Sequence, residues 1–137
     1  PTRASEDSRR WREQNKQAKR DYERGRLNTP EGRAYEMLKG ARERSRKMGL
    51  PCGITIEWIK QRTVAGVCEV TGIPFNFTRR AKRGPFRTPF TPSIDRTDPD
   101  KGYNPDNCQV VVLIYNIAKG GWGHDPVQQL ANALGAK

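Results

Sequence analysis

The stretch SIDRTDPDKGYNPDNCQVVVLIYNIAKGGWGH, residues 93–124, decides the fold. Ser93–Arg96 and Cys108–Val112 are typical of two short strands, and the loop of residues 98–107 between them is rich in turn-forming proline, glycine and asparagine. Leu113–Lys119 follows without a break and predicts a helix, which a pair of glycines then interrupts. The stretch therefore predicts a β-hairpin followed directly by a helix.

Three polar residues stand at the junctions of this unit. Asp95 lies at the end of the first strand, Asn107 opens the second, and Asn116 lies nine residues later, one turn into the helix. If strand and helix pack together, Asp95 and Asn116 face each other across one small site. Carboxylate and amide oxygens are hard ligands that suit Mg²⁺, Mn²⁺ or Ca²⁺. The Asn107 side chain can tie the long loop to the hairpin, although a simple turn-rich hairpin also accommodates asparagine there.

The segment resembles the HNH (ββα-metal) endonuclease family, in particular its phage and restriction members. The resemblance spans about residues 30–121, and its motif core is residues 95–119. The matching elements are Ile94-Asp95-Arg96, Gly102-Tyr103, Asn107, Asn116-Ile117-Ala118-Lys119 and, upstream, Cys68-x-x-Thr71-Gly72. The fold class that it implies is α+β, with a ββα-metal core at about residues 93–121 preceded by a basic helical region.

The resemblance also implies an activity and assigns roles. In this family one divalent ion stabilises the leaving oxygen and the charged transition state of phosphodiester cleavage. By the resemblance, Asp95 and Asn116 hold Mg²⁺ or Mn²⁺, and Lys119 and Arg96 contact phosphate. The residues with catalytic roles are Asp95, Arg96, Tyr103, Asn107 and Asn116.

Arg96 departs from the family pattern, which usually has a histidine there as general base. An arginine cannot take up a proton at neutral pH, so the chain resembles an Asp-Arg subset whose base lies elsewhere. The candidates near the motif are Tyr103, Tyr115 and His124. Histidine ionises near pH ~6.5 and tyrosine near ~10, so a tyrosine would need a cationic neighbour such as Arg96. Because His124 lies outside the core motif, we expect a tyrosine.

A second departure is the missing zinc knuckle. The three cysteines, Cys52, Cys68 and Cys108, form no C-x-x-C pair, so we expect no structural zinc and apolar packing in its place. Their odd number and wide spacing also argue against a disulfide framework and favour a reducing, cytoplasmic setting. No apolar run approaches the ~18 residues of a membrane span, and the N-terminus lacks the apolar region of a signal peptide, so no membrane partner is expected.

The net charge points to a polyanionic partner. The chain has 137 residues with 26 Lys+Arg against 15 Asp+Glu, a formal charge of +11, and only 34% hydrophobic residues. Most of the excess positive charge lies in residues 1–50. The charge balance favours a polyanion, and the resemblance to the nuclease family implies that this partner is DNA, with the double-stranded form expected.

One folded domain is expected, a nuclease domain at residues 29–137, preceded by a basic helical arm at residues 1–28. Residues 5–26 predict a helix capped by Ser5, with only Trp11, Ala18 and Tyr22 as apolar positions. Such a helix packs on a partner through its one stripe of apolar residues or becomes ordered when it binds its ligand, and the alternative is a solvated helical tail.

The nuclease domain begins with a helical lead-in at residues 29–66. Thr29 caps a helix that Pro30 starts and Gly49 ends, and a shorter helix runs from Ile56 to about Arg62 under the cap of Thr55. Further expected elements are a short strand at Ile73–Phe77 and a last helix, capped by Asp125 and reaching Leu134.

The expected DNA-binding residues are the basic ones at the end of the lead-in helix, in the loop of residues 79–92 and at the end of the motif. They are Arg42, Arg44, Arg46, Lys47, Arg79, Arg80, Lys82, Arg83 and Lys119.

The sequence thus favours a divalent-metal-dependent DNA endonuclease. One alternative is a non-catalytic nucleic-acid-binding module on the same fold, with catalysis lost through Arg96. Another is a structural basic protein. The oligomeric state is left open, with a homo-oligomer among the alternatives.

Overall fold

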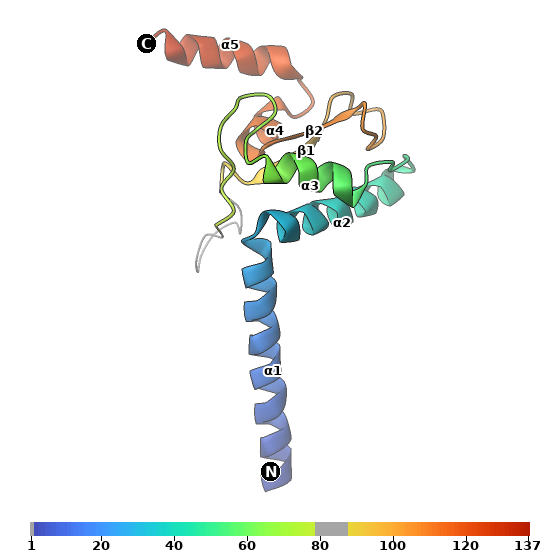
Figure 1. Ribbon diagram of the computed structural model, residues 1–137, viewed down its shortest axis with the longest axis vertical. Helices are drawn as coiled ribbons and strands as arrows, with labels where there is room; N and C mark the ends of the chain where they lie inside the picture. Colours follow the sequence, from blue (N-terminus) through green and yellow to red (C-terminus); the bar gives the residue numbers. More distant parts are fainter. Residues whose placement is uncertain (1, 79–87) are drawn as a thin grey trace.

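The computed structural model describes residues 2–78 and 88–137, and it is a mixed α+β structure, as predicted. Figure 1 shows its elements along the chain. The helices and strands are α1 (Arg3–Leu27), α2 (Pro30–Met48), α3 (Ile56–Val64), β1 (Pro92–Arg96), β2 (Cys108–Val112), α4 (Leu113–Lys119) and α5 (His124–Gly135).

The hairpin and the helix after it confirm the prediction for residues 93–119. β1 pairs antiparallel with β2, in a register that sets Pro92 opposite Val112 and Asp95 opposite Gln109. The helix α4 begins at Leu113, directly after β2, and the Leu113 amide donates a hydrogen bond to the carbonyl of Thr91, just before β1. This bond holds the start of α4 against the start of the hairpin, so the two strands and the helix form one unit.

The helix α2 packs one of its faces into the hydrophobic core. Its N-cap is Thr29, whose hydroxyl accepts from the Gly32 amide at 3.1 Å, and its C-cap is Gly49 with φ +64°, a conformation that favours glycine. Both ends are as predicted. One face of α2 buries Ala34, Leu38, Ala41 and Ser45. This face packs with the fully buried Val110, Val111 and Val112 of β2 in a single hydrophobic core.

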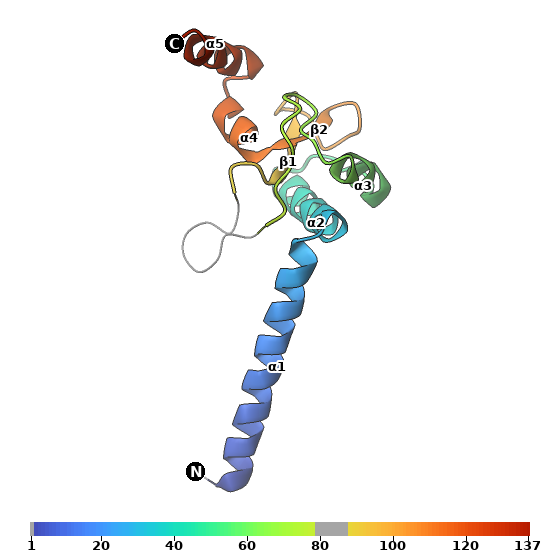
Figure 2. The same ribbon diagram turned by 60° about the vertical axis from the view of Figure 1, so that its left-hand side comes forward.

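The helix α3 lies along α2, as Figure 2 shows from a second direction. Its Thr55 cap accepts from the Trp58 amide at 3.2 Å, and Ile59 is fully buried. The helix runs two residues beyond the predicted end at Arg62.

The structure has no strand at Ile73–Phe77, so the prediction of one is wrong. The segment forms only a single antiparallel bridge, between Val67 and Pro74. The neighbouring turn instead joins β2 through Glu69, whose carboxylate accepts from the Val110 amide and whose own amide donates to the Val110 carbonyl at 3.0 Å. Propensity for a strand is not enough where no partner strand is within reach.

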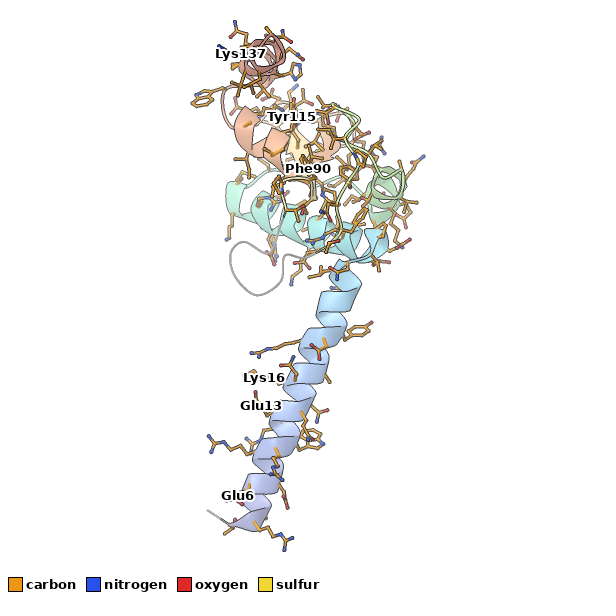
Figure 3. All side chains as sticks on the ribbon, turned by 90° about the vertical axis from the view of Figure 1, so that its left-hand side faces the viewer. Glu6, Glu13, Lys16, Phe90, Tyr115 and Lys137 are labelled. Atoms are coloured by element: carbon orange, nitrogen blue, oxygen red, sulfur yellow. The ribbon has the colours of Figure 1, made fainter. Side chains whose placement is uncertain are left out.

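The helix α1 extends away from the rest of the molecule as an isolated arm, and the two chain termini lie at opposite ends of the long axis (Figures 1 and 2). Its N-cap is Thr2, and the predicted cap Ser5 instead donates its hydroxyl to the Thr2 carbonyl at 2.6 Å. Figure 3 shows Glu6, Glu13 and Lys16 projecting from the helix into open space. Within residues 2–78 and 88–137, no helix has the length and apolarity needed to cross a membrane.

The junction between α1 and α2 is tight. The Thr29 hydroxyl donates to the carbonyl of Arg26 at 2.8 Å, and the Thr29 amide donates to the same oxygen. A side chain at Gly32 would meet that carbonyl, because a Cβ built there lies 1.9 Å from the oxygen. A glycine is therefore required where the two helices meet.

The last helix, α5, begins at His124, one residue before the predicted cap Asp125, and its N-cap is Gly123 without a side-chain cap bond. None of its residues is buried. It contacts the body through His124, whose Nδ1 is 2.9 Å from the hydroxyl of Tyr115 on α4.

Candidate functional site

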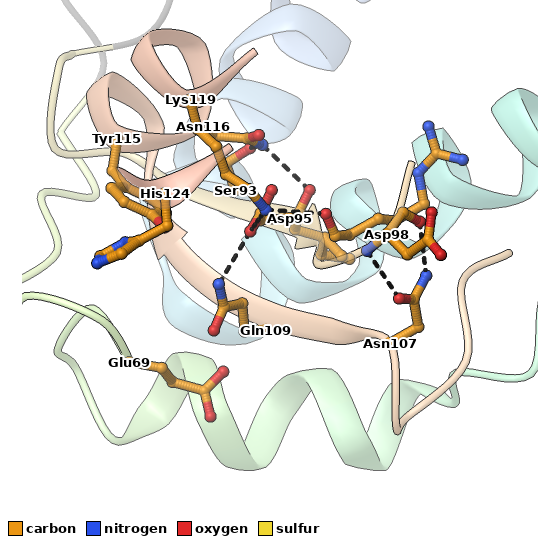
Figure 4. A network of polar contacts seen from close by, with 12 residues as sticks. Glu69, Ser93, Asp95, Asp98, Asn107, Gln109, Tyr115, Asn116, Lys119 and His124 are labelled. Carbon is orange, nitrogen blue, oxygen red and sulfur yellow. Dashed lines mark hydrogen bonds and ion pairs between the residues drawn. The ribbon is translucent and has the colours of Figure 1, made fainter. Parts of the chain in front are cut away.

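Asp95 is the centre of the polar network that joins the hairpin to α4 (Figure 4). Its side chain is only 4% exposed. The Oδ2 atom accepts from Lys119 Nζ at 2.8 Å and from Gln109 Nε2 at 2.9 Å. Lys119 supplies an opposite charge and Gln109, on the paired position of β2, supplies a neutral donor, so this buried carboxylate is compensated from two sides.

Asn116 is held against β1 by its amide nitrogen. Nδ2 donates to the hydroxyl of Ser93 at 2.9 Å and to the carbonyl of Ile94 at 3.1 Å. Both hydrogens of the amide are used, which fixes the orientation of the side chain and leaves Oδ1 as an acceptor.

Asp95 and Asn116 line the same cleft, as the sequence predicts for two residues that face one site. The cleft has a volume of about 600 Å³ and lies between α2 on one side and the β1–α4 unit on the other. Within the described part of the chain, Asp95 Oδ1 and Asn116 Oδ1 accept no hydrogen bond. Each residue is thus fixed through one atom and keeps one oxygen available.

Tyr103 joins the two walls of this cleft. Its ring lies under the guanidinium of Arg96 from β1, with 5.0 Å between the guanidinium carbon and the ring centre, and under that of Arg44 from α2 at 5.5 Å. The Nε atom of Arg44 also donates to the Tyr103 hydroxyl at 2.8 Å. Two cations that line the cleft therefore share one buried ring, beside the available oxygens of Asp95 and Asn116.

Asn107 ties the loop between the strands, as the sequence indicates. Its Oδ1 accepts from the Asp98 amide at 2.9 Å, and its Nδ2 donates to the carbonyls of Asp98 at 3.0 Å and Gly102 at 2.9 Å. The side chain uses three of its hydrogen-bonding positions on the loop backbone and is 7% exposed. Its role is to hold the loop that carries Tyr103, and it does not line the cleft.

Lys119 is buried and bonded within the fold. It is 7% exposed, and its ammonium is bound by Asp95 Oδ2 and, at 3.0 Å, by the Arg96 carbonyl. The predicted phosphate contact by Lys119 is not supported by this placement, because the charge is already compensated inside the fold.

The three candidates for the general base differ in where they lie relative to the cleft. Tyr103 lines the cleft, whereas Tyr115 and His124 lie outside it and bond to each other. Burial and the nearby charge of Asp95 raise the pKa of Tyr115, so at neutral pH less of this side chain is in the phenolate form that a general base requires. Of the tyrosines expected to serve as base, only Tyr103 is in position.

The other expected DNA-binding residues fall into two groups. Arg42, Arg46 and Lys47 are exposed at the end of α2, and Arg42 and Arg46 line a second cavity there, beyond the cleft. The predictions for Arg79, Arg80, Lys82 and Arg83 lie outside the described residues.

Sequence reasoning missed two carboxylates in the cleft wall, Glu36 and Glu43 of α2. They are seven residues apart and therefore share a helix face with the cleft, but an acidic pair on a highly charged helix carries no specific signal in the sequence. Gln109 was missed as well. Gln109 lies two residues after Asn107 and pairs with Asp95 in the hairpin register. Aligning the two predicted strands with each other could have shown this pairing.

The oxygen atoms available in the cleft fit a divalent ion of the Mg²⁺ or Mn²⁺ type, which prefers such ligands and keeps several waters. Outside residues 1 and 79–87, no three side chains of the His, Cys, Asp or Glu type gather to hold a metal. An ion in the cleft would thus be held by Asp95, Asn116, water and the oxygens of a bound phosphate.

The turn that contains Cys68 packs into the core. Cys68 is 2% exposed, and its amide donates to the carbonyl of Ile73 at 2.9 Å. Burial alone would raise the pKa of the Cys68 thiol, but hydrogen bonds from the Thr71 hydroxyl and from backbone amides, Val112 among them, lower it. In contrast, burial raises the pKa of Cys108 to about 11.

Comparisons of the chain with protein-family models, with curated proteins and with solved structures give no significant match.

Proposed function

We propose that the chain is a divalent-metal-dependent DNA endonuclease built on a ββα-metal core, in which the hairpin β1–β2 and the helix α4 form the site. The observation that carries the proposal is the pairing of Asp95 and Asn116 in one cleft, each with one side-chain oxygen free of hydrogen bonds from the described residues. A bound ion would supply a Lewis acid that stabilises the leaving oxygen of a phosphodiester.

Charge in and around the cleft supports a phosphodiester as substrate. Arg44 and Arg96 line the same cleft as Asp95 and Asn116, and both guanidiniums contact Tyr103. Arginine forks suit the oxygens of a phosphate, and the chain's charge of +11 favours a polyanion overall. In this proposal Arg96 binds the scissile phosphate and Tyr103 serves as the base.

A specific observation favours a second candidate, a non-catalytic DNA-binding module. Lys119 already compensates the carboxylate of Asp95 with an ion pair of 2.8 Å, and Arg96 stands where the family usually has its base. In that case the cleft would hold phosphate through Arg44 and Arg96 without cutting.

Supercoiled plasmid separates the two candidates. The endonuclease converts it to nicked or linear DNA with Mg²⁺ or Mn²⁺ and fails to do so with EDTA, whereas the binding module leaves the plasmid intact under every condition. Asp95→Asn should abolish cleavage and keep or raise DNA affinity, because it removes a negative charge near phosphate. Asp100→Asn is the matched control, since it removes the same charge from the exposed loop and should cut normally.

A readout besides cleavage tests the metal ligands. Mn²⁺ is paramagnetic, so in an NMR spectrum it should broaden the side-chain amide of Asn116 well before that of Asn107, which lies outside the cleft. Equal broadening of both amides, or cleavage by Asp95→Asn at the parent rate, would remove Asp95 and Asn116 as ligands.

The base is tested by Tyr103→Phe, which keeps the ring under both guanidiniums and removes only the hydroxyl. Loss of rate with unchanged DNA affinity supports Tyr103. Retained rate with Tyr103→Phe and loss with Glu36→Gln or Glu43→Gln would transfer the role to a carboxylate of α2.

A further inference from the structure

The arm α1 has a stripe of uncharged residues that nothing in the described structure covers. The aromatic side chains of Trp11 and Tyr22 are 66% and 70% exposed. They are eleven residues apart, just over three full turns, so they lie on the same side of the helix. Helices in proteins take most of their stability from packing one face, and α1, with 25 residues, leaves this aromatic side exposed, which favours a partner there.

The stripe follows a seven-residue repeat along the whole arm. Positions spaced alternately four and three residues apart form the seam of a coiled coil. From the first to the last turn of α1 these positions carry no charge, and every charged residue of the helix lies at the other positions. The seam is Ala4, Ser8, Trp11, Asn15, Ala18, Tyr22 and Gly25.

The charges that flank the seam on the partner-facing edges have opposite signs. The seam alternates between two sets of positions, one with Ala4, Trp11, Ala18 and Gly25 and the other with Ser8, Asn15 and Tyr22. The residues that follow the first set, among them Arg12, Lys19 and Arg26, and those that precede the second set, among them Asp7 and Asp21, are the ones that contact the other helix. In a parallel two-stranded coiled coil, a residue before the second set contacts the residue five positions later in the other helix.

This rule matches Asp7 of one copy with Arg12 of the other, and Asp21 with Arg26. In an antiparallel pair, each edge of one helix would contact the same edge of the other helix, so Arg12 and Lys19 would meet basic residues of the second copy. The charge pattern is therefore complementary to a second copy of the same helix in parallel orientation only.

We infer that α1 is a dimerisation arm, and that two copies of the chain associate through their uncharged stripes as a parallel coiled coil. Asn15 at a central seam position fixes two-strand pairing and register, and the small residues Ala4, Ser8 and Ala18 make room for the rings of Trp11 and Tyr22. The inference does not depend on the proposed function.

Nucleic acid is a poor occupant of the stripe itself. Phosphate recognition requires cations, and the seven seam positions have none. The basic residues on the other faces, Arg9 and Lys16 among them, remain available to DNA while the seam is covered. The body of the molecule does not cover the stripe either, because the arm extends away from it (Figure 3).

The experiment measures the mass of the full chain by sedimentation equilibrium without metal or DNA. The expected mass is twice the 15.6 kDa of one chain, and Trp11 fluorescence should shift to the red on dilution as the dimer dissociates. Ala18→Glu puts a charge in the seam and should weaken the dimer more than about tenfold, without loss of helix, because glutamate is a good helix former.

A matched pair of identical substitutions tests the parallel register. Gln14→Glu places a carboxylate before the seam, opposite Lys19 of the second copy, and should tighten the dimer about three- to fivefold through two new ion pairs. Gln17→Glu makes the same change on the outer face, where it also replaces the amide that donates to Asp21 at 3.0 Å, and should not tighten the dimer.

Two outcomes would overturn the inference. One is a single-chain mass at every concentration. The other is an equal effect of Gln14→Glu and Gln17→Glu on the dimer constant.

Discussion

Replacing Lys119 with methionine removes the positive half of the ion pair with Asp95 and keeps a side chain of similar length. The two side chains are 8% and 5% exposed, so water cannot take over the role of the ammonium. After the substitution, the carboxylate keeps only the hydrogen bond from Gln109 at 2.9 Å. We therefore expect a large loss of stability.

The size of the loss follows from burial. Removing one partner of a buried ion pair costs about 3–5 kcal/mol, and the remaining bond from Gln109 places Lys119→Met near the lower end, at about 3 kcal/mol. For a chain of 137 residues this corresponds to a fall of the melting temperature by roughly 10 °C. The double variant Asp95→Asn with Lys119→Met should recover about 2 kcal/mol of the loss, because it no longer buries an uncompensated charge.

Urea denaturation at pH 7, followed by circular dichroism, measures the four free energies of this double-mutant cycle. Mg²⁺ adds a second readout. If Asp95 is a metal ligand, the ion should stabilise Lys119→Met more than the parent chain, since the ammonium no longer competes for the carboxylate, and it should not stabilise the double variant.

A loss below about 1 kcal/mol in Lys119→Met would refute the reasoning, because it would mean that the pair is open to water or that its desolvation cost cancels its attraction. A large loss without any effect of Mg²⁺ would leave the ion-pair argument intact and count against the metal site alone.

Three further predictions concern the loop, α4 and the arm junction. Asn107→Ala removes three hydrogen bonds to the loop backbone and should cost about 2–3 kcal/mol in urea denaturation, whereas Asn104→Ala in the same loop should cost less. Because burial raises the pKa of Tyr115 above its ordinary 10.0, the folded protein keeps a proton that the unfolded chain loses, so the unfolding free energy should decrease as the pH rises through about 10, and Tyr115→Phe should make that decrease smaller. Gly32→Ala pushes a Cβ against the Arg26 carbonyl and should cost about 1–3 kcal/mol, whereas Gly25→Ala, with nothing within 4 Å, should raise the melting temperature.

The parts of the fold that could be predicted are those with local causes. Thr29, Pro30 and Gly49 bound α2 because capping and a left-handed residue act within a few positions of the chain. The hairpin and α4 were predictable for a similar reason, since the turn-rich loop and the apolar Val110–Val112 run leave few alternatives. Ile73–Phe77 failed because a strand needs a partner, and the sequence does not say which segment lies beside it.

The candidate site could be predicted in its residues but less well in their contacts. Asp95 and Asn116 were found because hard oxygen ligands at strand and helix ends form a recognisable pattern. The contacts of Lys119 could not be predicted, since a lysine at the end of a helix is ordinarily exposed, and its ion pair with the buried Asp95 joins segments that are far apart in the sequence. Glu36 and Glu43 enter the cleft only because α2 packs across β1, a contact between distant segments that no local rule predicts.

The tight junction between α1 and α2 has a consequence for how such a chain can change over time. Only Asn28 and Thr29 separate the two helices, and the direction of the arm depends on the Thr29 cap, on Pro30 and on the bare backbone of Gly32. Since α2 has its own cap and first turn, the arm can be redirected or exchanged without rebuilding the core. Substitutions at these few positions would alter how far and in which direction the molecule extends, while the cleft, which α2 lines from Arg33 to Arg44, stays as it is.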